Sequence, residues 1–113
     1  MPRADDASKE WFRSLVGEAP NVLVRPMFGN LAASVNGNMF LALFGDRVAV
    51  RLGEADRAAL LAKRGAGPFE PMPGRPMAEY VLLPESWRTQ PKQARTWVDR
   101  SLAYASGLPP KKK

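Results

Sequence analysis

The chain has 113 residues and carries 17 Lys and Arg against 11 Asp and Glu, a net charge of +6, with no histidine and no cysteine. The missing residue types exclude the usual zinc and copper sites, the Ser-His and Cys-His nucleophile pairs and the imidazole proton shuttle. No apolar run reaches the roughly 18 residues of a membrane-spanning helix, and the first ten residues contain acids where a secretory signal would be apolar. We therefore expect a cytoplasmic protein with no membrane contact.

The first predicted element is a helix over residues 5–17, DDASKEWFRSLVG. Asp5 or Asp6 suits the N-cap, because a short acidic side chain accepts hydrogen bonds from the first backbone N–H groups, and Gly17 is the expected C′ residue. One side of this helix carries an apolar stripe for the core, formed by Trp11, Phe12, Leu15 and Val16.

Two tight turns organise the middle of the chain. Residues 21–28 come first, and Pro26 argues against a central strand there, so we expect an edge strand or an extended loop. Residues 31–52, LAASVNGNMFLALFGDRVAVRL, then predict three antiparallel strands. Asn36-Gly37 and Gly45-Asp46 supply residues that tolerate positive φ, as two-residue hairpin turns require.

Two-residue turns place Val35 opposite Asn38 and Phe44 opposite Arg47, and this register assigns the faces of the sheet. The predicted core face holds Ala32, Ser34, Met39, Leu41, Leu43, Val48, Val50 and Leu52. The predicted opposite face holds Leu31, Ala33, Val35, Phe40, Ala42, Phe44 and Ala49, rimmed by Arg47 and Arg51. Two phenylalanines on an outer face suggest a contact surface. Its candidate residues are Phe40, Phe44, Arg47, Arg51, Leu31 and Val35, and either a dimer mate, another protein or residues 65–76 would cover them.

The next segment predicts a helix, a loop and a strand. Residues 53–64 form the helix, with acids at its start and Gly65 as C′ residue, and its small apolar side chains favour packing across the core face. Residues 65–76 are rich in Gly and Pro and predict a loop or short irregular strand in which Phe69 plugs the edge of the core. Residues 77–83 predict a further strand.

A last helix closes the predicted domain. Residues 85–87 form a turn, and Pro91 suits the first position of a helix that runs to about Ser106. We expect one domain over residues 1–107 and a disordered basic tail over residues 108–113. The core-facing stripe of the helix consists of Ala94, Trp97, Val98, Leu102 and Ala105.

Three stretches, VRPMFGN, NGNMFLALFGDRVAVRL and PFEPMPGRPMAEYVLLPESW, give the chain a resemblance to the TfoX N-terminal domain family over nearly its whole length. Asn30 stands where that family often has a second glycine, and Asn can also adopt the left-handed conformation. The family motif is matched first at Arg25, Met27, Phe28 and Gly29, and further on at Phe40, Phe69, Gly74, Tyr80 and Pro84.

The resemblance implies an α+β, two-layer α/β sandwich of α-β-β-β-α-β-β-α order, similar to secretion-chaperone folds, with a mainly antiparallel sheet and helices on one face. It also implies a link to natural competence. In the two-domain members a helical domain follows and the protein works with the cyclic-AMP receptor protein at promoters.

These observations favour a non-enzymatic regulatory or protein-interaction domain, an accessory protein related to transcription, that works as a homodimer or with a protein partner through the exposed sheet face. The alternative is a nucleic-acid-binding module that stacks bases on the aromatic and arginine face, with phosphate contacts from Lys111, Lys112 and Lys113. An enzyme would have only carboxylates, Lys, Tyr and Ser to draw on, and the acids Glu70, Glu79 and Glu85 are near one another in the sequence. We expect no catalytic, cofactor or metal site.

Overall fold

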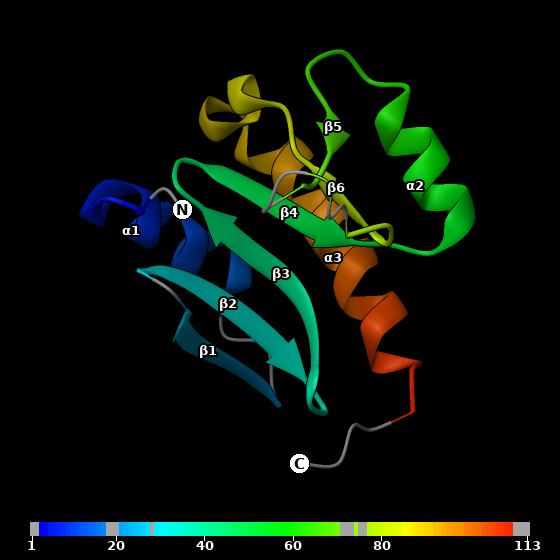
Figure 1. The fold of residues 1–113 in the computed structure, drawn as a ribbon, viewed down its shortest axis with the longest axis horizontal. Coiled ribbons are helices and arrows are strands. Elements are labelled where there is room, and N and C mark those ends of the chain that lie inside the picture. Colours follow the sequence, from blue (N-terminus) through cyan, green and yellow to red (C-terminus); the bar gives the residue numbers. More distant parts are fainter. Residues whose placement is uncertain (1–2, 18–20, 28, 71–73, 75–76, 110–113) are drawn as a thin grey trace.

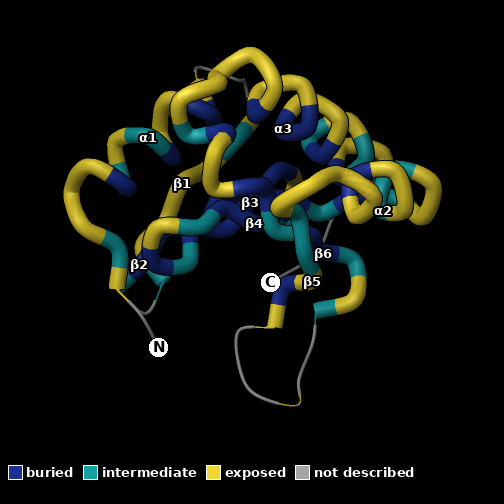
Figure 2. The backbone as a smooth tube through the Cα atoms, turned by 90° about the horizontal axis from the view of Figure 1, so that it is seen from above, coloured by how far each residue is buried: buried dark blue, intermediate teal, exposed yellow. Residues whose placement is uncertain are grey.

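The computed structural model describes residues 3–17, 21–27, 29–70, 74 and 77–109 and has an α+β architecture. Three α-helices lie on one side of a six-stranded antiparallel sheet of order β1-β2-β3-β4-β6-β5 (Figures 1 and 2). In the described part of the chain, no helix is long and apolar enough to cross a membrane. The elements are α1 (Asp6–Val16), β1 (Val22–Met27), β2 (Asn30–Val35), β3 (Asn38–Phe44), β4 (Arg47–Arg51), α2 (Glu54–Leu61), β5 (Gly67–Pro68), β6 (Tyr80–Leu82), the 3-10 helix η1 (Glu85–Thr89) and α3 (Pro91–Ser106).

The segment containing Pro26 is the edge strand β1, so four strands precede α2 where the family resemblance implied three. Pro26 pairs with Leu31 of β2, and none of the other described strands lies beside β1 on its other side. An edge strand tolerates proline because the missing N–H can point to solvent. The sequence reasoning about this segment is therefore confirmed, and the implied element order gains one strand.

Both predicted turns are present, and Gly45 has φ 64°. Asn36 and Gly37 have φ values of 52° and 80°, the signature of a type I′ turn. The β3–β4 hairpin keeps the predicted register from the pair Phe44–Arg47 to the pair Leu41–Val50. The β2–β3 hairpin does not keep its predicted register. Ser34 pairs with Met39 but Ala33 pairs with Leu41, which leaves Phe40 as the extra residue of a β-bulge.

The side chains of β2, together with Met39 and Phe40 of β3, lie on the face opposite the predicted one because of the bulge. Phe40 and Leu41 both lie in the helix-side core, and Phe40 is only 1% exposed. The assignment of β2 was therefore wrong by one residue, which in a strand moves every side chain to the other face. Leu31, Ala33, Val35 and Phe40 belong to the helix-side core, whereas Met39 packs in a second cluster on the opposite face, where Ala42 lies opposite Ala32.

Helices α1 and α3 cover the centre of the sheet (Figure 1). Asp5 is the N-cap of α1, since its carboxylate accepts a 2.8 Å hydrogen bond from the N–H of Ser8, and Gly17 ends the helix with φ 64°. Helix α3 begins at Pro91 and ends at Ser106, as predicted. The main core joins these helices to the sheet through Phe12, Leu15, Leu43, Val48, Val50, Trp97 and Val98.

Helix α2 lies at the β6 end of the sheet and does not cross the core face, so the predicted packing across that face was wrong (Figure 1). It buries a single side chain, Leu60, while Leu61 remains 45% exposed. Its alanines face solvent, because the space over the centre of the sheet is already filled by α3.

The remaining segments are close to the prediction. The strand predicted over residues 77–83 is the shorter β6, and Gly67 and Pro68 form a two-residue strand beside it. After α3, Leu108 packs against the main core and the carbonyl of Pro109 accepts a 3.0 Å hydrogen bond from the side chain of Asn38. The predicted tail residues 110–113 lie outside the described residues.

Candidate functional site

The sheet face opposite the helices is covered at its β4–β6 end. Phe69, 3% exposed, places its ring 5.5 Å from that of Phe44 and 6.1 Å from that of Tyr80. The N–H of Met77 donates a 2.9 Å hydrogen bond to the carbonyl of Phe69. The prediction that Phe69 plugs the edge of the core was therefore wrong. Phe69 covers a second cluster on the far side of the sheet.

The β1–β3 end of the same face has no such cover among the described residues (Figure 2). Leu23 of β1 is 57% exposed and lies opposite Ser34, and Arg25 lies opposite Ala32. Arg25 is also the single charged residue between positions 21 and 44. We call this surface the open half-face; it consists of the exposed Leu23 and Arg25 and the half-buried Ser34 and Met39, the last at its border with the second cluster.

The arginine at the end of β4 belongs to an internal ion network. Arg51 contacts one carboxylate oxygen of Glu79 through Nε at 2.8 Å and Nη2 at 2.6 Å, while the other oxygen accepts a 3.1 Å hydrogen bond from Tyr104 Oη. Arg57 Nη1 lies 3.9 Å from that second oxygen. These hydrogen bonds, that from Arg51 first, hold the pKa of Glu79 below its usual value. The carboxylate therefore ties strand β4 to α2 and α3.

The same network also binds a backbone carbonyl beside the bulge. The carbonyl of Met39 accepts a 2.9 Å hydrogen bond from Tyr80 Oη and a 3.4 Å bond from Arg51 Nη1. Burial raises the pKa of Tyr80 to about 12, which keeps the hydroxyl protonated as a donor at neutral pH. Arg51 and Tyr80 are thus engaged in holding the sheet together.

The other predicted rim residue, Arg47, is also engaged internally. Its Nη2 donates to the carbonyls of Leu83 at 3.0 Å and Gly65 at 3.4 Å, and its Nη1 lies 3.9 Å from Glu85. Phe44 stacks edge-on against Phe69. The aromatic and arginine surface proposed for stacking bases is therefore occupied by the protein's own groups.

The three candidate acids each have a different partner. Glu79 is bound by Arg51, Glu85 lies near Arg47, and Glu70 accepts a 2.7 Å hydrogen bond from the N–H of Gly74. Within the described residues, no group of three acidic side chains could hold a metal ion. Each of the three carboxylates is thus engaged with a group of the protein itself.

Two buried polar residues with structural roles escaped the sequence reasoning. Ser101 of α3 accepts a 3.1 Å hydrogen bond from the N–H of Arg51 and donates a 2.7 Å bond to the carbonyl of Phe40. Its hydroxyl thereby bridges β3 and β4 beside the bulge. Asn30 accepts a 2.9 Å bond from the N–H of Gly45 and belongs to β2, outside the left-handed region expected for it.

The family-motif residues surround the β1–β2 connection. Arg25 is exposed on β1, Met27 is half-buried at its end, and Gly29 has φ 81°, so the left-handed position of the motif is taken by this glycine. Phe28 lies outside the described residues, as do Lys111, Lys112 and Lys113 with their predicted phosphate contacts.

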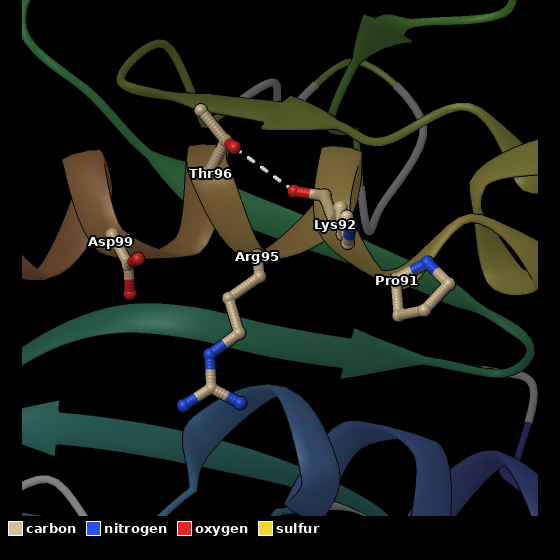
Figure 3. Close-up of a pocket in the computed structure, with 5 residues that line it drawn as sticks. All are labelled: Pro91, Lys92, Arg95, Thr96 and Asp99. Carbon is tan, nitrogen blue, oxygen red and sulfur yellow. Dashed lines mark hydrogen bonds between the residues drawn. The ribbon is translucent and has the colours of Figure 1, made fainter.

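A shallow groove runs along α3 beside α1 and is lined by Pro91, Lys92, Arg95, Thr96 and Asp99 (Figure 3). Arg95 points from α3 toward α1, where its Nη1 donates a 3.2 Å hydrogen bond to the carbonyl of Ser14. This arginine neutralises the C-terminal carbonyls of α1, a role that stabilises a helix end. The groove therefore has a structural explanation.

In the described part of the chain, the structure thus combines the open half-face with arginine networks that bind the protein's own carbonyls and carboxylates. In comparisons with known proteins, residues 14–105 match the TfoX N-terminal domain, while no curated protein and no solved structure gives a match. Proteins with this domain are linked to competence regulation and are not known as catalysts. The match spans most of the 113 residues, and the chain therefore belongs to the TfoX N-terminal domain family.

Proposed function

We propose that the chain is a non-catalytic interaction domain that acts in transcription-related regulation, and that it contacts its partner through the open half-face. The family link to competence regulation supports the regulatory role. The observation that carries the contact surface is the exposure of Leu23, more than half of whose surface is accessible although it sits on a regular strand of the sheet.

Water contact at such a residue is unfavourable by about 25 cal/mol per Å² of apolar surface. The helix-covered face leaves no comparable residue on strands β2 to β4, and Phe69 covers the β4–β6 end of the other face. A partner that covers Leu23 and Met39 would complete the second layer that the fold lacks there. The partner is either a second copy of the chain or another protein.

The nucleic-acid alternative receives no support from the described residues. Base stacking needs open aromatic rings beside free cations, but Phe40 is buried and Arg47 and Arg51 bind carbonyls and a carboxylate. The open half-face has no aromatic side chain and one arginine, Arg25. Its chemistry fits a protein surface better than a nucleic acid.

The test compares Leu23→Asp with Leu61→Asp in the full chain. Both leucines are exposed, but Leu61 lies on α2, away from the open half-face. Light scattering at micromolar concentration and retrieval of bound proteins from native cytosol treated with nuclease measure the complex. We expect Leu23→Asp to abolish it and Leu61→Asp to retain it. Identical behaviour of the two variants, or a strict monomer that retains no protein, would remove the proposal.

A further inference from the structure

We propose that the outer edge of β1 pairs with an extended segment of another protein, and that a carboxylate of that segment lies beside Arg25. The inference rests on the proposed interaction role and specifies the chemistry of the partner. Strand β1 is the first strand of the sheet, and among the described strands it is hydrogen-bonded to β2 alone. Its backbone therefore presents a free edge along Val22–Met27, the arrangement used when a peptide adds a strand to a sheet.

The register indicates which backbone groups face outward. Met27 and Asn30 flank a two-residue connection, which makes them a hydrogen-bonded pair, and bonded and non-bonded pairs alternate along an antiparallel ladder. Arg25 is then bonded to β2, while the N–H groups of Val22 and Val24 point away from the sheet. Pro26, which has no N–H, falls on the outward side of the same alternation.

The side chains of β1 supply apolar contact on both faces of this edge. Leu23 is 57% exposed on the open half-face, and Val24, paired with Ala33, is 37% exposed on the helix side. Large exposed hydrophobic side chains are rare in the described part of the chain, and these two are adjacent on one strand. An added strand with aliphatic residues at neighbouring positions would cover both.

The positive charge of Arg25 indicates the chemistry of the partner segment. Arg25 is exposed, forms no ion pair with the described residues, and is the single charged residue between positions 21 and 44. A second copy of β1 offers it no carboxylate, and a pair of two-fold related β1 strands would lose a donor at Pro26 in each copy. A segment of different sequence that carries an Asp or Glu opposite Arg25 gains a cross-strand ion pair, and it meets the missing donor of Pro26 once instead of twice.

The probe is a library of random peptides of about a dozen residues, displayed on phage and selected on the full chain after depletion on the support without protein. We expect the selected peptides to carry an acid flanked by β-branched residues. Arg25→Glu should raise their Kd at least about tenfold, the worth of a close charge pair. A peptide with Lys in place of its acid should recover binding to Arg25→Glu, and Arg64→Glu, the same charge change in the exposed turn after α2, should leave Kd unchanged.

Hydrogen exchange in the presence of a selected peptide locates its backbone contacts. We expect slower exchange at the amides of Val22 and Val24, with Val24→Pro weakening binding while the variant keeps its circular dichroism. Absence of enriched peptides, equal binding to Arg25→Glu, or protection elsewhere would overturn the inference. A dimer that Leu23→Asp abolishes, without any enriched peptide, would overturn this inference and leave the proposed interaction role standing.

Discussion

The hydroxyl group of Ser101 links β3 to β4 beside the β-bulge at Phe40. Phe40 has no partner residue on β2, and its carbonyl accepts a hydrogen bond from Ser101, which in turn accepts one from the N–H of Arg51. The serine lies on the buried side of α3, between Trp97 and Ala105. A polar residue on an apolar helical stripe is a sequence signal for such a contact, although it does not identify the partner.

We predict that Ser101→Ala lowers the free energy of unfolding by about 1–3 kcal/mol, because two buried backbone groups lose their partner. Urea denaturation followed by circular dichroism measures the change as a lower midpoint at constant slope. Ser106→Ala, at the exposed end of the same helix, is the control and should change the midpoint little. Equal midpoints for the two variants would show that water replaces the hydroxyl.

At the scale of elements, the helices differ in how firmly they are held. Helices α1 and α3 bury apolar stripes against the sheet and each other, whereas α2 buries only Leu60. The periodic small residues of α2 predicted a helix correctly but not its position. Packing over the centre of the sheet was decided by α3, whose stripe contains the larger residue Trp97.

We predict that Leu60→Ala lowers the free energy of unfolding by about 2–5 kcal/mol, the range for truncating a buried leucine. It should also speed hydrogen exchange within α2 more than within α3, because the helix loses its one buried side chain. The adjacent Leu61→Ala, 45% exposed in the native structure, should change stability by no more than about 0.5 kcal/mol. Similar losses of stability for both leucine variants would contradict the conclusion that Leu60 alone holds α2 against the domain.

Across the whole molecule, Glu79 connects elements that the sequence leaves far apart. Its carboxylate binds Arg51 of β4, Tyr104 of α3 and, more distantly, Arg57 of α2. Because these contacts favour the ionised form, the pKa of Glu79 is lowered on folding, with the hydrogen bond from Arg51 as the largest cause.

A lowered pKa makes a definite prediction for the pH dependence of stability. The contribution of Glu79 is complete above its unfolded pKa of about 4.3 and is lost as the pH falls through the lower pKa of the folded state. Glu79→Gln should therefore reduce the loss of Tm on acidification, although it lowers Tm at neutral pH. Thermal unfolding from neutral to acidic pH, with Glu10→Gln on the exposed side of α1 as control, measures this difference. Parallel Tm curves for wild type and Glu79→Gln would refute it.

The sequence by itself determined the elements of this protein: the positive-φ turns at Asn36-Gly37 and Gly45, the ends of α1 and α3, and the faces of the β3–β4 hairpin from Leu41 to Val50. These features depend on backbone sterics and on residues close together in the chain. Only the tertiary structure decided which part of the sheet face stays open. Alternation in the sequence assumes that every residue has a partner, and the bulge at Phe40 breaks this assumption, because its side chain fills the helix-side core and its carbonyl binds a serine 61 residues away.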